Sequence, residues 1–252
     1  MSATFQCPVD SYRQVDPSDQ TGWNRTTLEF SRAHTALVVM HAWQPPPPGD
    51  FPGWVRAVPY LTRARHIIRQ NFPPLLNAVR AAGLPVFHVT GNDPNPSFEL
   101  PAVPTDPTWE SLRTFREQVV FPGADNLADV QAGRLHRTIA PEAQPLENET
   151  IAESSVALHA VCQRHQINHL IYIGFALNWC LLMSPAGMVE MKRYGYLCST
   201  VAESTAAVES RESSVDQSEY HQALWRVAVE FGFVFHQADL ITALKAPTLH
   251  SL

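Results

Sequence analysis

The clearest feature of the chain is an alternation between short apolar runs and longer segments in which apolar residues recur every three or four positions. Six runs rich in β-branched or aromatic residues predict strands, at 35–40, 84–90, 136–139, 170–173, 195–201 and 232–237. Helical spacing occupies the segments 62–82, 154–165, 217–231 and 239–244. This order predicts an α/β fold, a doubly wound and mostly parallel six-stranded sheet with helices on both faces.

The polar, aperiodic residues 1–33 are interpreted as an N-terminal arm that packs onto the body or onto a neighbouring subunit. Residues 34–252 then form a single domain, which is long enough to bury a core without disulfides or metals. Four consecutive prolines at 45–48 could form a polyproline ligand for a partner domain. Directly after a buried strand, however, such a run is more typical of a rigid loop.

Charge, hydropathy and cysteine content exclude several classes of protein. The 18 Lys and Arg residues against 24 Asp and Glu give a net charge of −6 and leave no basic stripe for nucleic acid. The apolar stretch 170–189 is interrupted by Asn178, Ser184 and Pro185, so a membrane span is not expected. The spacing of the four cysteines predicts no disulfide, and the N-terminus does not resemble a signal peptide. A cytoplasmic protein is therefore expected.

The candidate chemistry follows the strand at 170–173. A short turn leads from this strand to Cys180, which opens an apolar segment of helical length that closes near Gly195. A thiol at this place lies at the carboxyl edge of a parallel sheet, where helix-terminal amides favour thiolate and can bind an oxyanion. Cys180 is therefore the candidate nucleophile, although many free cysteines are simply buried hydrophobes. Pro185 leaves two alternatives open: the regular helix begins at Ser184, or the proline kinks it.

Four segments together resemble the isochorismatase-like cysteine hydrolases. They lie at 35–41, 81–88, 174–180 and 194–203, within a resemblance that covers about 35–245. Its most specific element is Gly-x-Ala-x-Asn-x-Cys, formed by Gly174, Ala176, Asn178 and Cys180 between strand and helix. The resemblance implies hydrolysis of a small amide, ureide or related C–N bond through a thioester on Cys180. It also suggests a homo-oligomer acting on a small-molecule substrate.

The family's architecture further implies how the turn before Cys180 is built. A cis peptide bond between Phe175 and Ala176 would aim the amides of Ala176 and Cys180 at the oxyanion. A non-proline cis bond is rare because it costs about 3–4 kcal/mol, so this is a sharp prediction. Asn178 is expected to hold the turn by hydrogen-bonding backbone rather than by contacting substrate.

The other two catalytic positions depart from the family's pattern. His41 stands where the first strand usually ends in Asp, and the usual Lys falls on Glu147, or on Glu149 if the loop differs by two residues. In one interpretation His41 takes the proton of Cys180 and Glu147 orients the imidazole, giving a Cys-His-Glu triad. In the other, the site is catalytically silent and the protein binds a small molecule or a protein partner. Two random losses would rarely supply another base and another carboxylate, so we favour the enzyme.

Side chains near these positions could line a substrate pocket. The candidates are Trp43, Trp54, His88, Trp109, Leu177 and Trp179. Each alone is more typical of ordinary packing, and His88 of a core or rim histidine. Nicotinamidase-type relatives hold a metal with Asp and clustered His after the second strand. No His occurs between 89 and 135 in this sequence, so we expect no metal, and we expect no cofactor.

Overall fold

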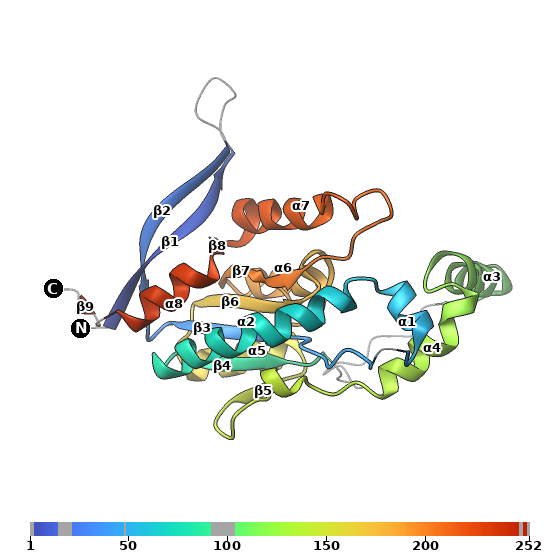
Figure 1. The fold of residues 1–252 in the computed structure, drawn as a ribbon, viewed down its shortest axis with the longest axis horizontal. Helices are drawn as coiled ribbons and strands as arrows, with labels where there is room; N and C mark the ends of the chain where they lie inside the picture. Colours follow the sequence, from blue (N-terminus) through green and yellow to red (C-terminus); the bar gives the residue numbers. More distant parts are fainter. Residues whose placement is uncertain (1–2, 15–21, 48, 92–103, 247–248, 251–252) are drawn as a thin grey trace.

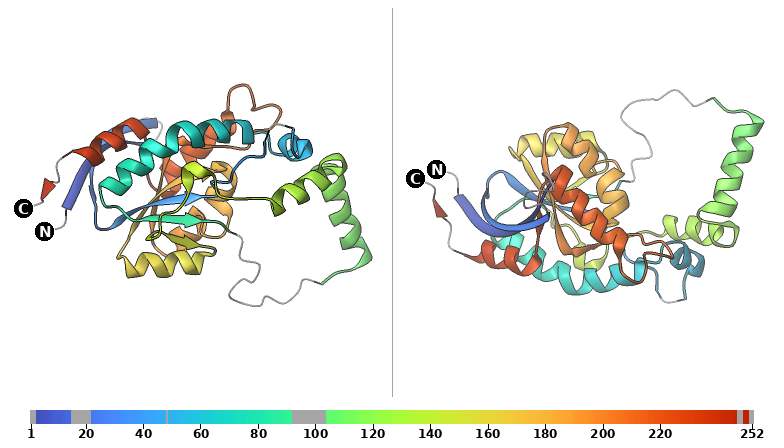
Figure 2. Two further views of the ribbon diagram at one scale, coloured as in Figure 1. Left: turned by 60° about the horizontal axis from the view of Figure 1, so that its bottom comes forward. Right: turned by 90° about the horizontal axis from the view of Figure 1, so that it is seen from above.

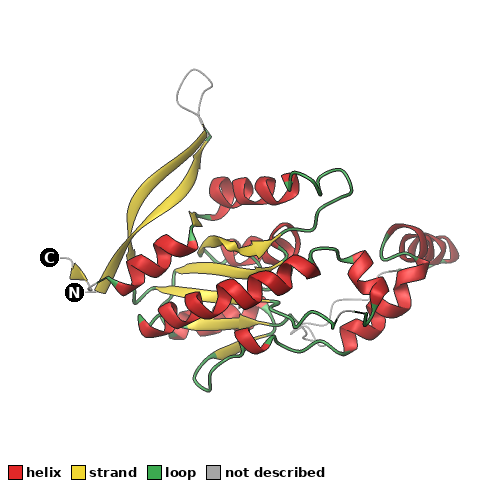
Figure 3. Cartoon of the chain, in the orientation of Figure 1, coloured by secondary structure: helices red, strands yellow, loops and turns green. Residues whose placement is uncertain are grey.

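The computed structural model describes residues 3–14, 22–47, 49–91, 104–246 and 249–250 (Figure 1). Within these ranges, six parallel strands lie side by side in one sheet in the spatial order β5-β4-β3-β6-β7-β8. They are β3 (Thr35–Met40), β4 (Val86–Val89), β5 (Thr150–Ala152), β6 (His169–Phe175), β7 (Leu197–Ala206) and β8 (Val234–Phe235). Figure 3 shows these strands between the helices. The mostly parallel α/β sheet predicted from the sequence is confirmed.

The number of strands differs from the prediction because the N-terminal residues are a β-hairpin. β1 (Ala3–Arg13) and β2 (Gly22–Ser31) pair antiparallel, and β1 also pairs with β8. The described path through the sheet therefore has eight strands, β2-β1-β8-β7-β6-β3-β4-β5, and the short β9 (Leu249–His250) pairs with β1. The hairpin extends the sheet beyond β8 (Figure 1). The expected arm does pack onto the body, but as strands rather than as an aperiodic segment.

The far edge of the sheet also differs from the prediction. Residues 136–139 were predicted to be a strand, but within them the structure has a single antiparallel bridge between Ile139 and Trp43. The edge strand is β5 instead, which pairs with β4. Its three residues include exposed Ile151 and buried Ala152, a pattern too short to identify a strand from the sequence alone.

The two central strands are buried on both faces and separate two cores. Every residue of β3 and β6 is buried. Alternate side chains face opposite sides of the sheet, and a core covers each side. Gly174 of β6 pairs with Met40 of β3, and a Cβ there would overlap the carbonyl oxygen of Met40. The close packing of these two strands therefore requires the glycine of the sequence motif.

Helices cover both faces, as predicted for a doubly wound sheet. α2 (Leu61–Ala81) and α8 (Gln237–Lys245) contribute to one core. α5 (Ser155–Arg164), α6 (Met188–Arg193) and α7 (Ser218–Arg226), which continues as η4 (Val227–Phe231), contribute to the other. Figure 2 shows α2 and α8 on the opposite side of the sheet from α5 and α6. α5 begins where its sequence indicates, because the Ser154 hydroxyl accepts a hydrogen bond from the amide of Ala157 at 3.2 Å.

Four further helices lie beyond the carboxyl edge of the sheet, at the opposite end from the β1–β2 hairpin (Figure 1). They are α1 (Pro52–Ala57), α3 (Pro107–Phe115), η1 (Arg116–Val120) and α4 (Ala124–Leu135). The short η2 (Pro141–Ala143) follows α4 in the chain and packs against α2. α1 and α4 share a small core of their own around Trp54, Leu61 and Val130. Within the described ranges, no helix combines the length and the apolar character needed to cross a membrane.

Candidate active site

Cys180 lies on a single helical turn directly after the central strand β6. The strand ends at Phe175, and the Phe175–Ala176 peptide bond, expected to be cis, is cis in the structure. The turn η3 (Leu177–Leu181) follows, and the carbonyl of Ala176 accepts hydrogen bonds from the amides of Trp179 at 3.2 Å and Leu181 at 3.0 Å. The backbone thus reverses at the carboxyl edge of the sheet and places Cys180 there.

The regular helix begins later than predicted. Cys180 does not open it: α6 begins at Met188 with Gly187 as its N-cap, beyond Pro185, so neither alternative for the proline holds. A helix of six residues that starts a full turn or more away adds little field at the thiol, because the dipole effect falls off within the first turn. The expected helix-dipole contribution at Cys180 is therefore wrong.

Asn178 holds the turn against another part of the chain. Its Nδ2 donates to the carbonyl of Val208 at 2.8 Å, and the amide of Val208 donates to its Oδ1 at 2.9 Å. This paired contact is to backbone, as predicted, although the backbone belongs to the segment that follows β7. Asn178 therefore fixes the Cys180 turn relative to residues 207–209.

Cys180 is the accessible thiol of the protein. The other three cysteines are completely buried, whereas Cys180 is half-buried, and all four are free. Burial raises the pKa of Cys7 and of Cys162 to about 12, and it also raises the pKa of Cys198. These three thiols are held protonated at neutral pH, which leaves Cys180 as the candidate nucleophile.

His41 lies at the carboxyl end of β3, the neighbour of β6. Its amide donates to the carbonyl of Val89 at 3.0 Å, and its ring stacks on Trp43 with centroids 5.9 Å apart. Within the described chain, its buried Nε2 has no hydrogen-bond partner, and the same is true of Thr90 Oγ1. Burial, helped by the charge of Arg137, lowers the pKa of His41 to about 4. The imidazole is therefore neutral at pH 7 and able to accept a proton.

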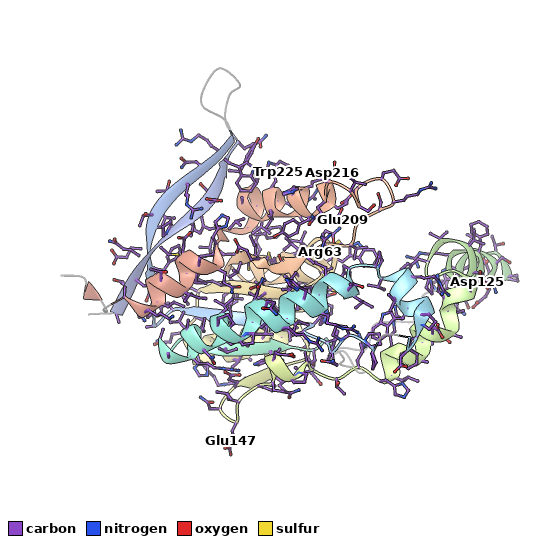
Figure 4. The ribbon with its side chains drawn as sticks, in the orientation of Figure 1. Arg63, Asp125, Glu147, Glu209, Asp216 and Trp225 are labelled. Atoms are coloured by element: carbon purple, nitrogen blue, oxygen red, sulfur yellow. The ribbon has the colours of Figure 1, made fainter. Side chains whose placement is uncertain are left out.

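The predicted partner of His41 is elsewhere. Glu147 lies on an exposed turn at the lower edge of the molecule and points away from its body (Figure 4). Among the described residues, no hydrogen bond or ion pair joins Glu147 to His41. The Cys-His-Glu triad is therefore not assembled through Glu147, because the turn directs this side chain into solvent.

Glu149, the alternative third residue, is engaged with a different histidine. Its carboxylate lies 2.9 Å from His88 Nε2 and 2.7 Å from Arg80 Nε, and it accepts the amide of Leu146 at 2.9 Å. Burial acts to raise the pKa of Glu149, but the hydrogen bonds from Arg80, Leu146 and His88 outweigh it and lower this pKa to about 2. The carboxylate ties the 144–149 loop to β4 and α2, and His88 is a core histidine rather than a pocket residue.

A cation that the sequence did not indicate lies beside Cys180. The guanidinium of Arg137 is 5.1 Å from the centre of the Trp43 ring and half-buried. Burial lowers the pKa of Arg137, while negative charge on Cys180 and on Tyr60 opposes that change. Arg137 and Cys180 are thus close enough to interact electrostatically. The bridge from Ile139 to Trp43 brings Arg137 here, and nothing local in the sequence signals that bridge.

Two of the predicted pocket residues remain near the candidate site. Trp43 contacts His41 and Arg137, as described above. Trp179, next to Cys180 in the chain, is 40% exposed and meets Phe121 edge to face, with ring centroids 5.7 Å apart. These two rings contact different neighbours, and neither has a ring contact with the other among the described residues.

The other predicted pocket residues lie outside the site. Trp54 packs against Gly133 of α4, where a Cβ would overlap its ring. Leu177 is fully buried in the core. Trp109 is on α3, with the Arg113 guanidinium 5.2 Å from its ring centre. The predicted aromatic pocket is therefore wrong as a unit. In the described part of the chain, no cluster of three or more His, Cys, Asp or Glu could hold a metal ion.

The strand order, the helices on both faces and the Cys180 turn after β6 define the isochorismatase-like α/β fold. Solved structures of isochorismatase-family cysteine hydrolases match nearly the full chain at low identity. A cysteine hydrolase from Pseudomonas syringae pv. phaseolicola 1448A is 16% identical, with 86% of this chain and 94% of that chain covered and a TM-score of 0.52. An isochorismatase-type protein from Burkholderia xenovorans LB400 is 17% identical, with 84% and 87% covered and a TM-score of 0.54. No family model and no curated protein matches the chain. The likeness establishes the fold, and the reaction must be argued from the site.

Proposed function

We propose that this protein is a hydrolase that cleaves a C–N bond of a small amide or ureide through a thioester on Cys180. The observation that carries the proposal is the position of Cys180, a half-buried thiol at the carboxyl edge of the sheet. The ends of the neighbouring strands supply a neutral imidazole, His41, and a cation, Arg137, lies close by. Together these groups supply a nucleophile, a proton acceptor and a positive charge, which acyl transfer to a thiol requires.

The proposed reaction has two steps. The thiol proton passes to neutral His41, and the sulfur attacks the carbonyl carbon while the amides of Ala176 and Cys180 bind the oxyanion. The C–N bond breaks, the nitrogen takes the proton from the imidazolium of His41, and the amine leaves. Water then gives a proton to His41 and attacks the thioester, which releases the acid and restores the thiol. Arg137 attracts the negative charge of the thiolate.

Cysteine alkylation tests the nucleophile. With iodoacetamide and peptide mass spectrometry, we expect Cys180 to react much faster than Cys7, Cys162 and Cys198. Arg137→Met, which keeps the stem but removes the charge, is expected to slow alkylation of Cys180 by about tenfold, the effect of losing one close charge interaction. Arg134→Met, a neighbouring change on α4, is the matched control and should react as the wild type does.

His41 is tested in the same assay by His41→Ala, which should slow alkylation of Cys180 at neutral pH. Equal reactivity of all four cysteines, or an inert Cys180, would contradict the proposal. A rate that is unchanged in both His41→Ala and Arg137→Met would remove these two residues from the mechanism.

A catalytically silent binding protein is the second candidate, favoured by one specific observation. Among the described residues, no hydrogen bond joins Cys180 to His41, and the expected carboxylate, Glu147, points to solvent (Figure 4). This candidate predicts thermal stabilisation by small amides without release of ammonia from any of them. Ammonia release that depends on Cys180 would exclude it.

A further inference from the structure

A groove of about 630 Å³ lies beside the candidate site, between the start of α2 and the segment that follows β7. Its principal side chains are Tyr60, Arg63 and His66 on one wall and Ala207, Glu209 and Arg211 on the other. Figure 4 shows Arg63 and Glu209 close together between α2 and α7. The mechanism proposed above does not use this groove.

The groove adjoins the turn that carries Cys180. Tyr60, on its wall, stacks on Phe175 with ring centroids 5.9 Å apart and planes at 20°. Burial raises the pKa of Tyr60, and the negative charge of Cys180 raises it further, so the phenol and the thiol are near neighbours. On the other wall, Asn178 holds Val208 through two hydrogen bonds. Both walls are therefore fixed to the segment that leads into Cys180, one through Phe175 and the other through Asn178.

The charges in the groove favour an anion. The carboxylate of Glu209 caps the start of α7, where it accepts hydrogen bonds from the amides of Glu219 at 3.2 Å and Tyr220 at 3.0 Å. Arg63 donates to the neutral side chain of Gln217 at 2.8 Å, and no ion pair of the described residues involves Arg63 or Arg211. The groove lining thus carries the two positive charges of Arg63 and Arg211 against the single negative charge of Glu209, in a chain whose net charge is −6.

We infer that the substrate of Cys180 carries a carboxylate, which Arg63 binds in this groove while the scissile carbonyl lies at the thiol. Arg211, at the exposed mouth, adds a second positive charge. The planar guanidinium of Arg63 matches a carboxylate with two parallel N–H donors, and its half-buried position strengthens that contact. This inference rests on the proposed function and narrows its substrate class to small amides or ureides of carboxylic acids.

Matched alkylating probes test the groove without requiring catalysis. Iodoacetylglycine and its homologues with two or three methylene groups carry a carboxylate, and the corresponding iodoacetyl amino acid amides are neutral. We expect the best anionic probe to alkylate Cys180 about tenfold faster than its neutral partner, the effect of one charge-assisted hydrogen bond. Arg63→Met should remove this preference, and Arg63→Lys, which keeps charge but not the planar fork, should retain part of it.

Arg69→Met is the matched control, because Arg69 lies on the same helix but outside the groove, 3.8 Å from Glu142. It should keep the full preference for the anionic probe. Equal rates for anionic and neutral probes at every length would overturn the inference, and so would a preference that survives Arg63→Met.

The failure of the inference can be told apart from the failure of the proposed function by comparing succinamate with succinamide. A preference for the anionic probes without ammonia release from either amide supports the groove and overturns hydrolysis. Equal release from both amides, with no probe preference, overturns the groove and supports hydrolysis. Faster release from succinamate that is lost in Arg63→Met supports both.

Discussion

Trp43 is the residue that connects the two candidate groups around Cys180. Its ring stacks on His41, with ring centroids 5.9 Å apart. The Arg137 guanidinium lies over the same ring, with its Cζ 5.1 Å from the ring centre. The ring holds the guanidinium where its positive charge can interact with a thiolate on Cys180. His41 is held by its backbone and by this stacking, which replaces the carboxylate that was expected to orient it.

Gly91 limits the position of His41 from the other side. A Cβ on Gly91 would lie 2.6 Å from His41 Nε2, and the residue has a positive φ of 59°. We expect Gly91→Ala to displace the imidazole, which should slow alkylation of Cys180, and to lower the free energy of unfolding by about 1–3 kcal/mol. Urea unfolding and the alkylation rate of Cys180 measure the two effects.

Gly83→Ala is the control for this substitution. Gly83 also has a positive φ, 74°, but nothing lies within 4 Å of an added Cβ. Its replacement should lower stability through backbone strain alone and leave alkylation of Cys180 unchanged. Equal alkylation rates in both variants would mean that Gly91 does not position His41.

Residues of the site differ in how far the sequence identifies them. Cys180 and the cis bond before it belong to one continuous motif next to a strongly apolar strand, so local pattern was sufficient. Arg137 reaches the site through a bridge between segments far apart in the chain, which no local pattern encodes. Glu147 was predicted from the family's usual spacing along the chain, and the length of an exposed turn can differ from that spacing.

Strands that are apolar at every position could be predicted from the sequence, whereas strands that are very short or mostly exposed could not. β3 and β6 are apolar at every position, so their strands could be located directly. In β1, Phe5, Cys7 and Val9 are buried at alternate positions, which is typical of a strand. Its partner β2 is mostly exposed and has no such pattern. These two strands form because they pair with each other and with the sheet, which a local pattern does not predict.

One of the contacts between the β1–β2 hairpin and the parallel sheet is made by a histidine. β1 meets β8 at two residue pairs, and His236 lies 2.7 Å from Asp10 of β1 and 2.8 Å from Glu203 of β7. Burial acts to lower the pKa of His236, but the hydrogen bonds with Asp10 and Glu203 outweigh it and raise this pKa. Through these two contacts the imidazole links the hairpin to the parallel sheet.

This link predicts the direction of a pH effect. Because the pKa of His236 is higher in the folded state than in the unfolded chain, its stabilisation is complete below the unfolded value of about 6.5 and is lost as pH rises through the folded pKa. Urea unfolding across this range should show a fall with pH that His236→Gln removes. His221→Gln, an exposed change on α7, should leave the fall in place, and a fall that persists in His236→Gln would contradict the prediction.

At the scale of the whole molecule, the parallel sheet brings the parts of the candidate site to one edge. Met40 pairs with Val89 and with Gly174, so the residues that follow β3, β4 and β6 emerge side by side. α2 and the segment after β7 then enclose the groove that adjoins this edge. The homo-oligomer implied by the family resemblance stays a prediction, which light scattering on the purified protein can measure.

In the proposed reaction, Cys180 forms a thioester during hydrolysis of a small amide or ureide. The most direct measurement is the intact mass of the protein after acid quenching during incubation with such compounds, followed by peptide mapping. We expect an acyl adduct on the peptide that contains Cys180, with release of ammonia or an amine, and neither in Cys180→Ala. Release that persists in Cys180→Ala, or neither adduct nor release with any amide or ureide, would contradict it.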